Sequence, residues 1–395
     1  MIAAVCVFLF IALLGHWALC VGAFNRAAAS KWPCALVGVL EKSAVAMGAI
    51  VPVGFVTWLY CFEIESVTQF LEWPDGRAWL LYQIVCVIAA FKLLPRWLKS
   101  RFRKPIPQLV TNDTVYVDVA KELGHLPIGK FSTRLAMKLP RNEICQLAMP
   151  VKTLRLASLP QQLNGLSIVH LSDLHFTGQM SRAYYDYVVD RANEMQGDLI
   201  AITGDIIDSE ACLEWIPQTL GRLRAKHGIY FILGNHDKRI GDASRVRKAM
   251  IQCGMIDVGG RTLSAEINGI EVHLAGNELP WFPLRAADEL FRPQQRANSV
   301  FRVLLSHTPD QYLWARDRNY HLMLAGHCHG GQISLPLLGP IVSPSHHGAK
   351  YASGLFFETP TLMHVSRGIA GTHPLRFNCV PELAKLVLHH ADAAL

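Results

Sequence analysis

The sequence predicts an α/β domain that follows an N-terminal region of membrane-spanning helices. The chain of 395 residues is long enough for one large domain and a second module, and its 51% hydrophobic content is high for a soluble enzyme. The apolar surplus is concentrated in residues 1–104. From about residue 141 onwards, short β-branched or apolar runs alternate with turns and amphipathic helical patterns, which is typical of an α/β fold.

Three nearly uncharged runs, at 2–24, 43–62 and 78–94, have the length and composition of transmembrane helices. The first run could instead be a cleaved signal peptide, but no basic residue precedes its apolar stretch. The third run is the weakest, because only residues 78–91 are free of charge and Lys92 would have to reach the interface from near the end of the run. A buried or interfacial helix is the alternative for this run.

The charges that flank these runs predict an orientation. Basic residues dominate between the first two runs and again after the third run, whereas the loop between the second and third runs is acidic. Because basic flanks face the cytoplasm, we expect an outside N-terminus and a cytoplasmic C-terminal domain, as in an integral protein of a bacterial inner membrane. This orientation reverses if the third run does not span the membrane.

Charge and cysteine usage limit the partners and the compartment. Residues 1–104 hold 10 Lys and Arg residues against 5 Asp and Glu residues, which leaves 28 against 26 in the rest of the chain. The formal net charge of +7 therefore fits a basic collar on anionic lipid headgroups, and we expect no nucleic acid partner. The ten cysteines show no CxxC spacing, so reduced thiols are the simpler assumption. Nothing in the sequence indicates an oligomeric state.

Residues 105–141 are mixed in polarity and contain Pro105, Pro107 and Pro127. Prolines at this density interrupt regular structure. We therefore expect a membrane-proximal connector that carries one short helix, followed by a folded domain over 142–395.

Five short apolar runs in this domain are predicted to be strands, and each ends where polar residues begin. The runs are 166–171, 199–203, 229–233, 300–306 and 322–325. In open α/β sheets, ligands bind beyond the carboxyl ends of the strands. Five strand ends that are far apart in sequence can therefore converge on one site.

The polar residues after these strands are of the types that bind divalent metals. They occur in the segments Asp173-Leu174-His175, Gly204-Asp205-Ile206-Ile207-Asp208, Gly234-Asn235-His236-Asp237, Leu305-Ser306-His307 and Gly326-His327-Cys328-His329. A single cluster of this kind is more often a cap or a satisfied polar group than a metal ligand. Five clusters in order, each after a predicted strand, favour a metal site over a purely structural explanation.

The ordered set DxH, GDxxD, GNHD, H and GHxH resembles the calcineurin-like metallophosphoesterases over residues 142–395. The resemblance implies a four-layered α/β/β/α sandwich with a two-metal site at its edge. It implies Asp173, His175 and His329 as ligands of the first metal, Asn235, His307 and His327 as ligands of the second, and Asp205 as a bridge between them. Mixed oxygen and imidazole ligands suit Mn²⁺ first, with Zn²⁺, Fe or Mg²⁺ as alternatives.

Such a site predicts the hydrolysis of a phosphate ester or a pyrophosphate. Two cations that share one water lower its pKa, so that a metal-bridging hydroxide forms near neutral pH and attacks phosphorus in line. His236 is not assigned as a ligand, and we expect it to protonate the leaving oxygen or to bind the developing charge. Asp237 is expected to orient the imidazole of His236.

Other residues near these motifs have more than one interpretation. Cys328 stands where the family usually has Thr, and a small buried spacer is favoured over a thiolate ligand. His170 is expected in the core or behind the ligands, and Asp208 is expected to hydrogen-bond a ligand loop rather than a metal. His346 and His347 lie in a Pro/Ser/Gly-rich loop, where solvated histidines are the usual case.

Three further stretches, at 159–166, 276–281 and 376–382, resemble the membrane-associated subfamily of these enzymes. That subfamily includes the UDP-diacylglucosamine pyrophosphohydrolases of lipid A synthesis and related envelope phosphodiesterases. Together with a membrane anchor, the resemblance favours a lipid-linked nucleotide sugar or another phospholipid as substrate. A membrane-anchored phosphodiesterase for soluble substrates and a catalytically silent membrane scaffold are the alternatives.

Four residues are candidates for substrate contact. Trp281 and Phe282 are candidates for an acyl-contacting surface, with a packed hydrophobic corner as the alternative. Arg367 and Arg376 are candidates for binding a phosphate, with a surface ion pair as the alternative.

Overall fold

The computed structural model describes residues 2–64, 66–284 and 300–393. The chain divides into two compact units. The first unit, called the helical unit, comprises Met1–Arg103 and Pro344–Lys350. The second unit, called the α/β unit, comprises Lys104–Ser343 and Tyr351–Leu395.

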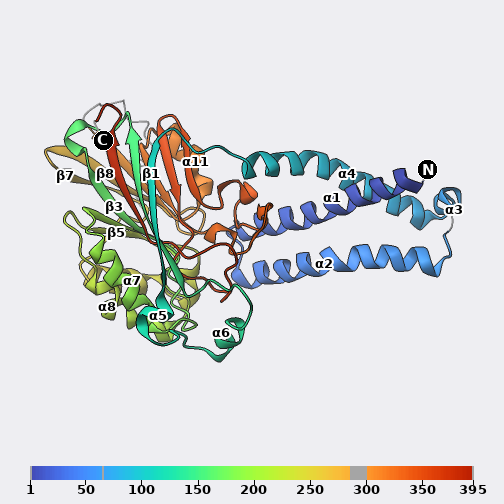
Figure 1. Ribbon diagram of the computed structural model, residues 1–395, viewed down its shortest axis with the longest axis horizontal. Helices are drawn as coiled ribbons and strands as arrows, with labels where there is room; N and C mark the ends of the chain where they lie inside the picture. Colours follow the sequence, from blue (N-terminus) through green and yellow to red (C-terminus); the bar gives the residue numbers. More distant parts are fainter. Residues whose placement is uncertain (1, 65, 285–299, 394–395) are drawn as a thin grey trace. The chain divides into compact units, whose positions relative to one another are not determined.

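Three long helices make up most of the helical unit (Figure 1). They are α1 (Ile2–Ala28), α2 (Cys34–Cys61) and α4 (Pro74–Arg101), and the short helix α3 (Val67–Glu72) precedes α4. Each long helix has the length and composition to cross a membrane, which confirms the prediction of three long apolar helices. Helix α4 is longer than the predicted 78–94, because Pro74 fits the first turn and the basic residues near the end do not interrupt helical hydrogen bonding.

Small and polar residues hold the three long helices together. A Cβ atom on Gly15 of α1 would lie 1.7 Å from the carbonyl oxygen of Cys86 in α4, so only glycine permits this approach. The ring of His16, which is buried, contacts the Tyr82 hydroxyl at 2.6 Å and the Met47 carbonyl at 3.1 Å. Polar groups inside membrane helices are stable when they are paired in this way.

A seven-stranded sheet forms the first half of the α/β unit, in the order β1-β2-β15-β3-β4-β5-β6. Its strands are β1 (Leu109–Asp118), β2 (Gln146–Leu156), β3 (Leu166–Leu171), β4 (Leu199–Thr203), β5 (Ile229–Ile232), β6 (Ile256–Asp257) and β15 (Ala384–His390). Strands β3 to β6 are parallel, so their carboxyl ends meet at one edge. Every residue of β3 and β4 is buried, which explains why these strands are mostly apolar runs in the sequence.

The second half is a six-stranded sheet in the order β13-β14-β10-β9-β8-β7. Its strands are β7 (Thr262–Ile267), β8 (Ile270–Asn277), β9 (Val300–Ser306), β10 (Leu322–Ala325), β13 (Gly354–Glu358) and β14 (Thr361–Val365). Strands β8, β9, β10 and β14 are parallel neighbours. A separate hairpin is formed by β11 (Ser334–Leu335) and β12 (Gly339–Pro340).

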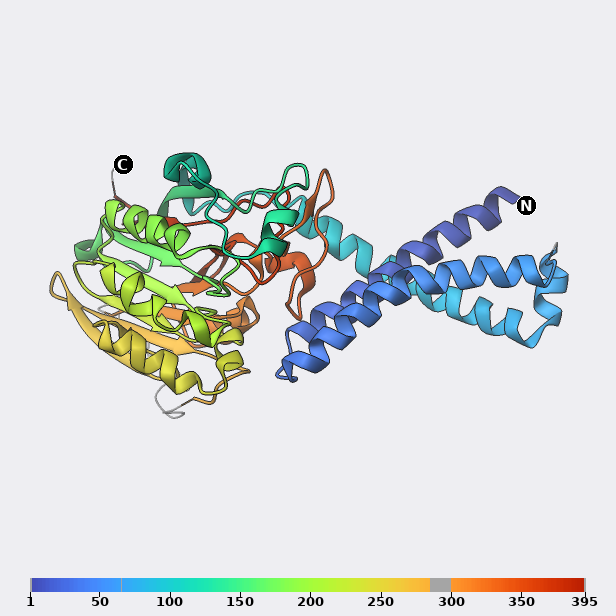
Figure 2. The same cartoon turned by 90° about the horizontal axis from the view of Figure 1, so that it is seen from below.

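The two sheets pack face to face between helices. Ile168 and Leu199 of the first sheet share one buried core with Phe301 and Leu322 of the second. The other face of the first sheet packs against α7 (Arg182–Glu194), α8 (Trp215–Gln218) and α9 (Ala243–Gln252). These green and yellow helices lie in front of the strands in Figure 2. Helix α11 (Tyr312–Asp317) covers the second sheet, which completes the α/β/β/α sandwich implied by the resemblance.

Residues 105–141 contain more structure than the expected connector. They supply strand β1 and two short helices, α5 (Val119–Leu123) and α6 (Phe131–Ala136). β1 pairs antiparallel with β2 at the edge of the sheet, and most of its residues are exposed. An exposed edge strand has little hydrophobic alternation, so its sequence does not distinguish it from a loop.

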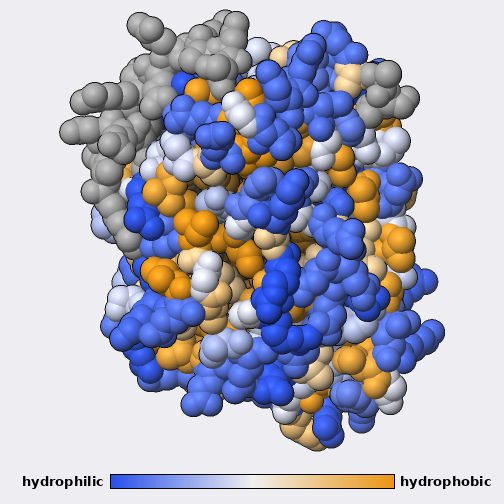
Figure 3. Space-filling view, turned by 90° about the vertical axis from the view of Figure 1, so that its left-hand side faces the viewer, coloured by the Kyte–Doolittle hydropathy of each residue, from blue (hydrophilic) through white to orange (hydrophobic). Residues whose placement is uncertain are grey.

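Figure 3 shows one face of the α/β unit in space-filling form. Hydrophilic side chains cover most of this face, and hydrophobic side chains are grouped near its middle. A surface of this mixed kind is normal for a water-exposed domain face.

Candidate metal centre

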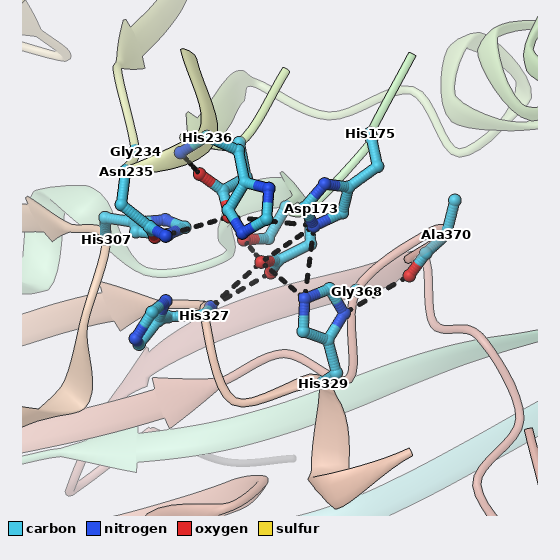
Figure 4. Close-up of polar contacts among 12 residues, drawn as sticks. Asp173, His175, Gly234, Asn235, His236, His307, His327, His329, Gly368 and Ala370 are labelled. Carbon is cyan, nitrogen blue, oxygen red and sulfur yellow. Dashed lines mark hydrogen bonds and ion pairs between the residues drawn. The ribbon is translucent and has the colours of Figure 1, made fainter. Parts of the chain in front are cut away.

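The loops that follow β3, β4, β5, β9 and β10 converge on one site (Figure 4). Several ligand candidates in these loops have positive φ angles: Asp173 (53°), His175 (47°), Asp205 (52°), His327 (68°) and His329 (50°). Residues other than glycine rarely adopt this conformation, and strained backbone of this kind is concentrated at functional sites. The strand-end loops therefore turn sharply at the residues whose side chains enter the site.

Four side chains form a first group of metal-binding type: Asp173, His175, Asp205 and His329. Their ligand atoms all lie within 4.8 Å of one another. The Nε2 atoms of His175 and His329 are 3.1 Å apart, and Nε2 of His329 is 3.4 Å from Oδ1 of Asp173. Oδ2 of Asp205 is 3.6 Å from Nε2 of His175.

A second group consists of Asp205, His307 and His327, also with ligand atoms within 4.8 Å of one another. Nε2 of His307 lies 3.2 Å from Oδ2 of Asp205 and 3.1 Å from Oδ1 of Asn235. Asn235 therefore adds an amide oxygen to this group. Asp205 belongs to both groups, which is the position expected of a bridging carboxylate.

The hydrogen bonds behind the ligands orient two of the imidazoles. Nδ1 of His307 donates to the carbonyl oxygen of Thr203 at 2.7 Å, and Nδ1 of His175 donates to Oδ2 of Asp208 at 2.7 Å. A ring nitrogen that donates to an acceptor leaves the other nitrogen available as a ligand. Nε2 of each ring, which faces the site, is therefore the atom free to bind a cation.

Unsatisfied polar atoms at the centre fit a pair of cations. Among the described residues, the buried atoms Oδ2 of Asp205 and Nε2 of His327 make no hydrogen bond. Buried polar atoms almost always have partners, so these two atoms are well suited to coordinate a cation. The short distance between Nε2 of His175 and Nε2 of His329 fits the same interpretation. A cation bound by both rings would lie between their lone pairs.

The pKa values in the site show an excess of negative charge. Burial lowers the pKa of His327 and of His329 well below the usual value, so both rings are neutral, as metal ligands must be. Burial also disfavours the charged form of His307, but Asp205 outweighs burial and raises the pKa of His307 to about 9. The carboxylates thus favour positive charge at this centre.

Glycine allows two of the loops to approach the ligands closely. A Cβ atom on Gly234 would lie 2.2 Å from Oδ1 of Asp205. A Cβ atom on Gly326 would lie 2.4 Å from Oδ2 of Asp173 and 1.8 Å from the hydroxyl oxygen of Ser172. A larger residue at either position would displace a ligand.

His236 lies beside the metal ligands and is partly exposed. Its Nδ1 atom is 2.5 Å from Oδ1 of Asp208, and its Nε2 atom is 3.9 Å from Oδ2 of Asp205. Arg239 also contacts Asp208, at 2.9 Å. Asp208 therefore orients the imidazoles of both His175 and His236. From the sequence, Asp237 was expected to orient the ring of His236.

Asp237 is fully buried and supports the backbone instead. Its carboxylate accepts hydrogen bonds from the amides of Gly234 (2.8 Å), Ile206 (2.9 Å) and Ile207 (3.0 Å). Burial raises the pKa of Asp237 to about 7. The expected contact with the ring of His236 is therefore wrong, because the carboxylate turns inward to the ligand loops.

Trp281 packs against the second ligand group. Its ring centroid lies 5.4 Å from that of His307 and 4.8 Å from that of His327, and it is 8% exposed. Phe282 packs against the core beside the first sheet, and the guanidinium of Arg247 lies 5.4 Å from its ring centroid. The structure thus places Phe282 in a packed hydrophobic corner, whereas Trp281 forms part of the wall of the metal centre.

Arg376 does not have the position of a phosphate-binding residue. It is fully buried, and its guanidinium donates to the carbonyl oxygens of His329, Arg367 and Ala370. The expected substrate contact is wrong, because these bonds use the guanidinium to fix the loop of a metal ligand. Arg367 pairs with the buried Glu382 at 3.0 Å, which corresponds to an ion pair rather than to a free phosphate site.

A buried chain of hydrogen bonds extends behind the metal centre between the two sheets. Lys152 donates to Oε1 of Glu382 at 2.6 Å and to Nε2 of His364 at 2.8 Å. The Nδ1 atoms of His364 and His170 are 2.9 Å apart, and Nε2 of His170 lies 2.9 Å from the hydroxyl of Thr203. Burial lowers the pKa of His364 to about 4 and that of His170 well below its usual value, so both rings are neutral.

This series of hydrogen bonds ends at Asp173, which is a metal ligand candidate. Thr203 donates to Ser172 at 2.8 Å, and Ser172 donates to Oδ2 of Asp173 at 2.6 Å. Because the Lys152 amine donates at one end and Asp173 accepts at the other, every donor along these bonds points toward Asp173. Apart from Asp173, only His170 among these residues was expected near the site, because no spacing pattern links residues that meet across two sheets.

Cys328 is fully buried, and burial raises the pKa of its thiol well above the usual value. A neutral thiol is a poor metal ligand, so this position corresponds to the small spacer expected between His327 and His329. The described cysteines form no disulfide. His346 and His347 are exposed and lie in the segment of the helical unit that comes late in the chain.

Comparisons with known proteins agree with this centre. Residues 166–331 match the family described as Calcineurin-like phosphoesterase. The chain is 33% identical to the uncharacterized metallophosphoesterase YkuE of Bacillus subtilis (strain 168) over 60% of this chain and 83% of that protein. It is 26% identical to the phosphodiesterase YaeI of Escherichia coli (strain K12), over 59% of this chain and 86% of that protein. A transmembrane protein with metallophosphoesterase domain from Bos taurus is 28% identical, and the match spans 59% of this chain and 55% of the bovine protein. The chain belongs to the calcineurin-like phosphoesterase family, whose members are metal-dependent hydrolases of phosphate esters.

Proposed function

We propose that this chain is a membrane-anchored hydrolase that binds two divalent metal ions and cleaves a phosphodiester or pyrophosphate bond. The observation that carries the proposal is the membership of Asp205 in both ligand groups. A shared carboxylate suits two ions that are roughly 3.5–4 Å apart. The proposed ligands are Asp173, His175 and His329 for one ion, Asn235, His307 and His327 for the other, and Asp205 for both.

The metals of this proposal are Mn²⁺ first, with Zn²⁺, Fe or Mg²⁺ as alternatives, because the ligands mix oxygen and imidazole nitrogen atoms. When bound, two such ions activate a water nucleophile and neutralise the charge on the phosphoryl oxygens. The protein residues bind, orient and protonate the substrate around them.

His236 is the proposed proton donor to the leaving oxygen. Its Nδ1 atom is held by Asp208, which leaves Nε2 to carry the transferred proton. The carboxylate of Asp208 stabilises the protonated ring before transfer, and Arg239 balances the charge of that carboxylate. In this proposal Asp208, rather than the predicted Asp237, is the carboxylate partner of His236.

The preferred substrate is a lipid-linked phosphate compound, either a nucleotide-linked glycolipid of the UDP-diacylglucosamine type or a phospholipid. Three helices of membrane-spanning length and a basic flank after the third support this choice, because an anchored enzyme meets lipid-linked substrates at a high effective concentration. A soluble phosphodiester is the second candidate, and it is favoured by the similarity to a phosphodiesterase of Escherichia coli.

A substrate comparison tests this choice. The full chain purified in detergent is assayed for bound metals and then for hydrolysis of UDP-linked diacylglucosamine, a cyclic nucleotide and a chromogenic phosphodiester. We expect the acylated compound to be hydrolysed with the highest kcat/KM. Equal or higher kcat/KM for the soluble compounds would assign the enzyme to soluble substrates.

The bridging role of Asp205 gives the first prediction. Asp205→Ala is expected to remove both metals, since one carboxylate belongs to both ligand groups, and to abolish nearly all turnover. Metal content by mass spectrometry and kcat are measured on the same preparations. Asp317→Ala, which removes an exposed carboxylate from α11, serves as the matched control. Wild-type turnover in Asp205→Ala would overturn the proposed site.

A further inference from the structure

The segment that contains α6 exposes a stripe of large apolar side chains in the α/β unit. Phe131, Leu135 and Leu139 follow one another at intervals of four residues and are 82%, 59% and 49% exposed. Residues four apart lie on the same side of a helical turn. Leu139 lies in the turn after α6, where its amide donates to the carbonyl of Ala136.

Basic side chains accompany this stripe. Lys130, Arg134, Lys138 and Arg141 are all exposed, and each lies within two residues of one of the three apolar positions. Apolar residues that are bordered by Lys and Arg are the pattern of segments that lie in the headgroup layer of anionic membranes.

A second exposed apolar element is the hairpin of β11 and β12. Its strands and turn expose Leu335 (37%), Leu337 (85%) and Leu338 (44%), and Ile333 just before β11 is 43% exposed. Large apolar side chains that are grouped on a tight turn mark a contact surface rather than a scatter of single residues.

Both elements are attached to the same stretch of chain, residues 374–378. The side-chain amide of Asn142 donates to the carbonyl of Ala136 at the end of α6 (3.0 Å) and to that of Pro374 (2.9 Å). On the other side, Phe377 accepts from the amide of Ser334 at 2.9 Å and forms a bridge with Ile333. α6 and the hairpin are therefore fixed to one support.

This support also leads directly to the metal centre. Arg376, which lies between the two attachment points, donates to the carbonyl of His329 at 2.9 Å. The hairpin itself begins only a few residues after His329. The exposed apolar elements thus border the loop that carries a ligand candidate of the first metal.

We propose that α6 with its basic neighbours and the β11–β12 hairpin form one membrane-contact surface, which enters the headgroup layer of an anionic bilayer beside the metal centre. Two features of the chain favour a lipid bilayer rather than a protein as the partner of this membrane-contact surface. The helical unit already supplies three helices of membrane-spanning length. The chain also passes, soon after the hairpin ends at Pro340, into Pro344–Lys350, a segment of that helical unit. The inference rests on membrane association and does not depend on the reaction proposed above.

Depth-dependent quenching tests the contact in the full chain. A fluorescent amino acid is incorporated at position 131, 337 or 251, and the protein is placed in nanodiscs that contain brominated lipids and about 30% anionic phosphatidylglycerol. Position 251 is the matched control, because Ile251 is 50% exposed on α9, away from both elements. We expect quenching at 131 and 337 and none at 251. Absence of quenching at 131 and 337, or equal quenching at all three positions, overturns the proposal.

A protein partner on the same surface is a separate outcome. If fluorescence at 131 and 337 responds to protein concentration but not to brominated lipid, a second copy of the chain covers the surface and the lipid assignment fails. Mass photometry of the same nanodiscs, which reports one or two chains per disc, identifies this case.

Variants that place charged residues on the hairpin test whether the membrane-contact surface contributes to turnover of lipid substrates. The double variant Leu337→Asp with Leu338→Asp is expected to lower turnover of a bilayer-embedded substrate by about tenfold, because two leucines no longer enter the lipid. Hydrolysis of a soluble chromogenic diester is expected to stay within about twofold, and Ile251→Asp is expected to change neither rate. Equal loss on both substrates would indicate damage to the site and overturn the proposal. If the wild-type chain hydrolyses neither substrate, the proposed function fails, while the quenching result still decides the surface.

Discussion

Asp208 holds two imidazole rings of the metal centre at once. It accepts from Nδ1 of both His175 and His236, at 2.7 Å and 2.5 Å. Burial alone would raise the pKa of Asp208, but His175 and His236 outweigh burial and hold this pKa far below its usual range. A carboxylate that remains ionised can orient a metal ligand and support a proton donor at the same time.

Replacement of this carboxylate separates its role from that of Asp237. Asp208→Asn is expected to lower both metal affinity and kcat by about 10- to 100-fold, because the amide loses the charge that orients the two rings. Asp237→Asn is expected to retain most activity per bound metal but to lower the thermal midpoint, since an amide cannot accept from three backbone N–H groups. Calorimetric metal titration, kcat and thermal unfolding are measured on both variants. Equal metal affinity in the wild type and in Asp208→Asn would contradict the assignment.

At the scale of elements, the metal centre depends on contact between the two sheets. Lys152 lies on β2 of the first sheet, and His364 lies on β14 of the second. Their hydrogen bond begins the chain of donors that ends at Asp173. Buried polar groups of this kind are stable only when every member has a partner.

Breaking this buried pair is expected to destabilise the α/β unit strongly. Lys152→Met leaves the carboxylate of Glu382 buried without its main partner, at a cost of about 3–5 kcal/mol. The double variant with Glu382→Gln is expected to recover part of this loss. Arg316→Met, which removes an exposed ion pair with Glu358, is the control and should shift the thermal midpoint of the full chain very little. An equally small shift in Lys152→Met would show that the buried pair contributes no stability.

The same pair predicts a pH dependence of stability. Burial raises the pKa of Glu382 by itself, but Lys152 and its other neighbours outweigh burial and hold this pKa well below the usual value. A depressed carboxyl pKa contributes stability above the unfolded-state pKa of about 4.3, and that stability is lost as pH falls toward the folded-state pKa. The difference in thermal midpoint between wild type and Glu382→Gln should therefore be constant from pH 7 to about 5 and shrink below about 4. A difference that grows on acidification would contradict this sign.

At the scale of the whole molecule, the chain combines two compact units whose surfaces suit different surroundings, lipid for the helical unit and water for the α/β unit. The long helices expose apolar side chains such as Val53 (63%) and Phe91 (67%), which lipid tolerates and water does not. The α/β unit instead has three buried apolar cores around its two sheets, and its exposed apolar residues include those of α6 and of the β11–β12 hairpin. Membrane association of the first unit is therefore a property of its surface, not only of its length.

The orientation of the membrane helices gives a prediction at this scale. With three spans and basic residues after the third, we expect the α/β unit in the cytoplasm. A fluorescent protein fused after Leu395 should fluoresce in a bacterial host, and alkaline phosphatase fused there should be inactive. Alkaline phosphatase fused after Glu63, in the loop between α2 and α3, is the matched control and should be active. The reverse pattern would place the metal centre outside the cytoplasm.

The sequence alone was sufficient for the elements whose residues share one environment. β3 and β4 are buried on both faces and are therefore mostly apolar runs, and the metal ligand candidates follow such strands at short spacings. β1 was missed, because an exposed edge strand has the composition of a loop. The burial of Arg376 was missed as well. The sequence does not distinguish an arginine on the surface from a buried arginine that donates to backbone carbonyls.

Sequence therefore determined the five strands that lead into the site, the apolar helices and the types of ligand, because each depends on residues that are near one another in the chain. Tertiary structure decided which side chains complete the site. Asp208 rather than Asp237 meets His236, and Lys152 meets His364 from a position 212 residues away. Such contacts depend on how two sheets and their loops pack, and no local pattern of residues records that packing.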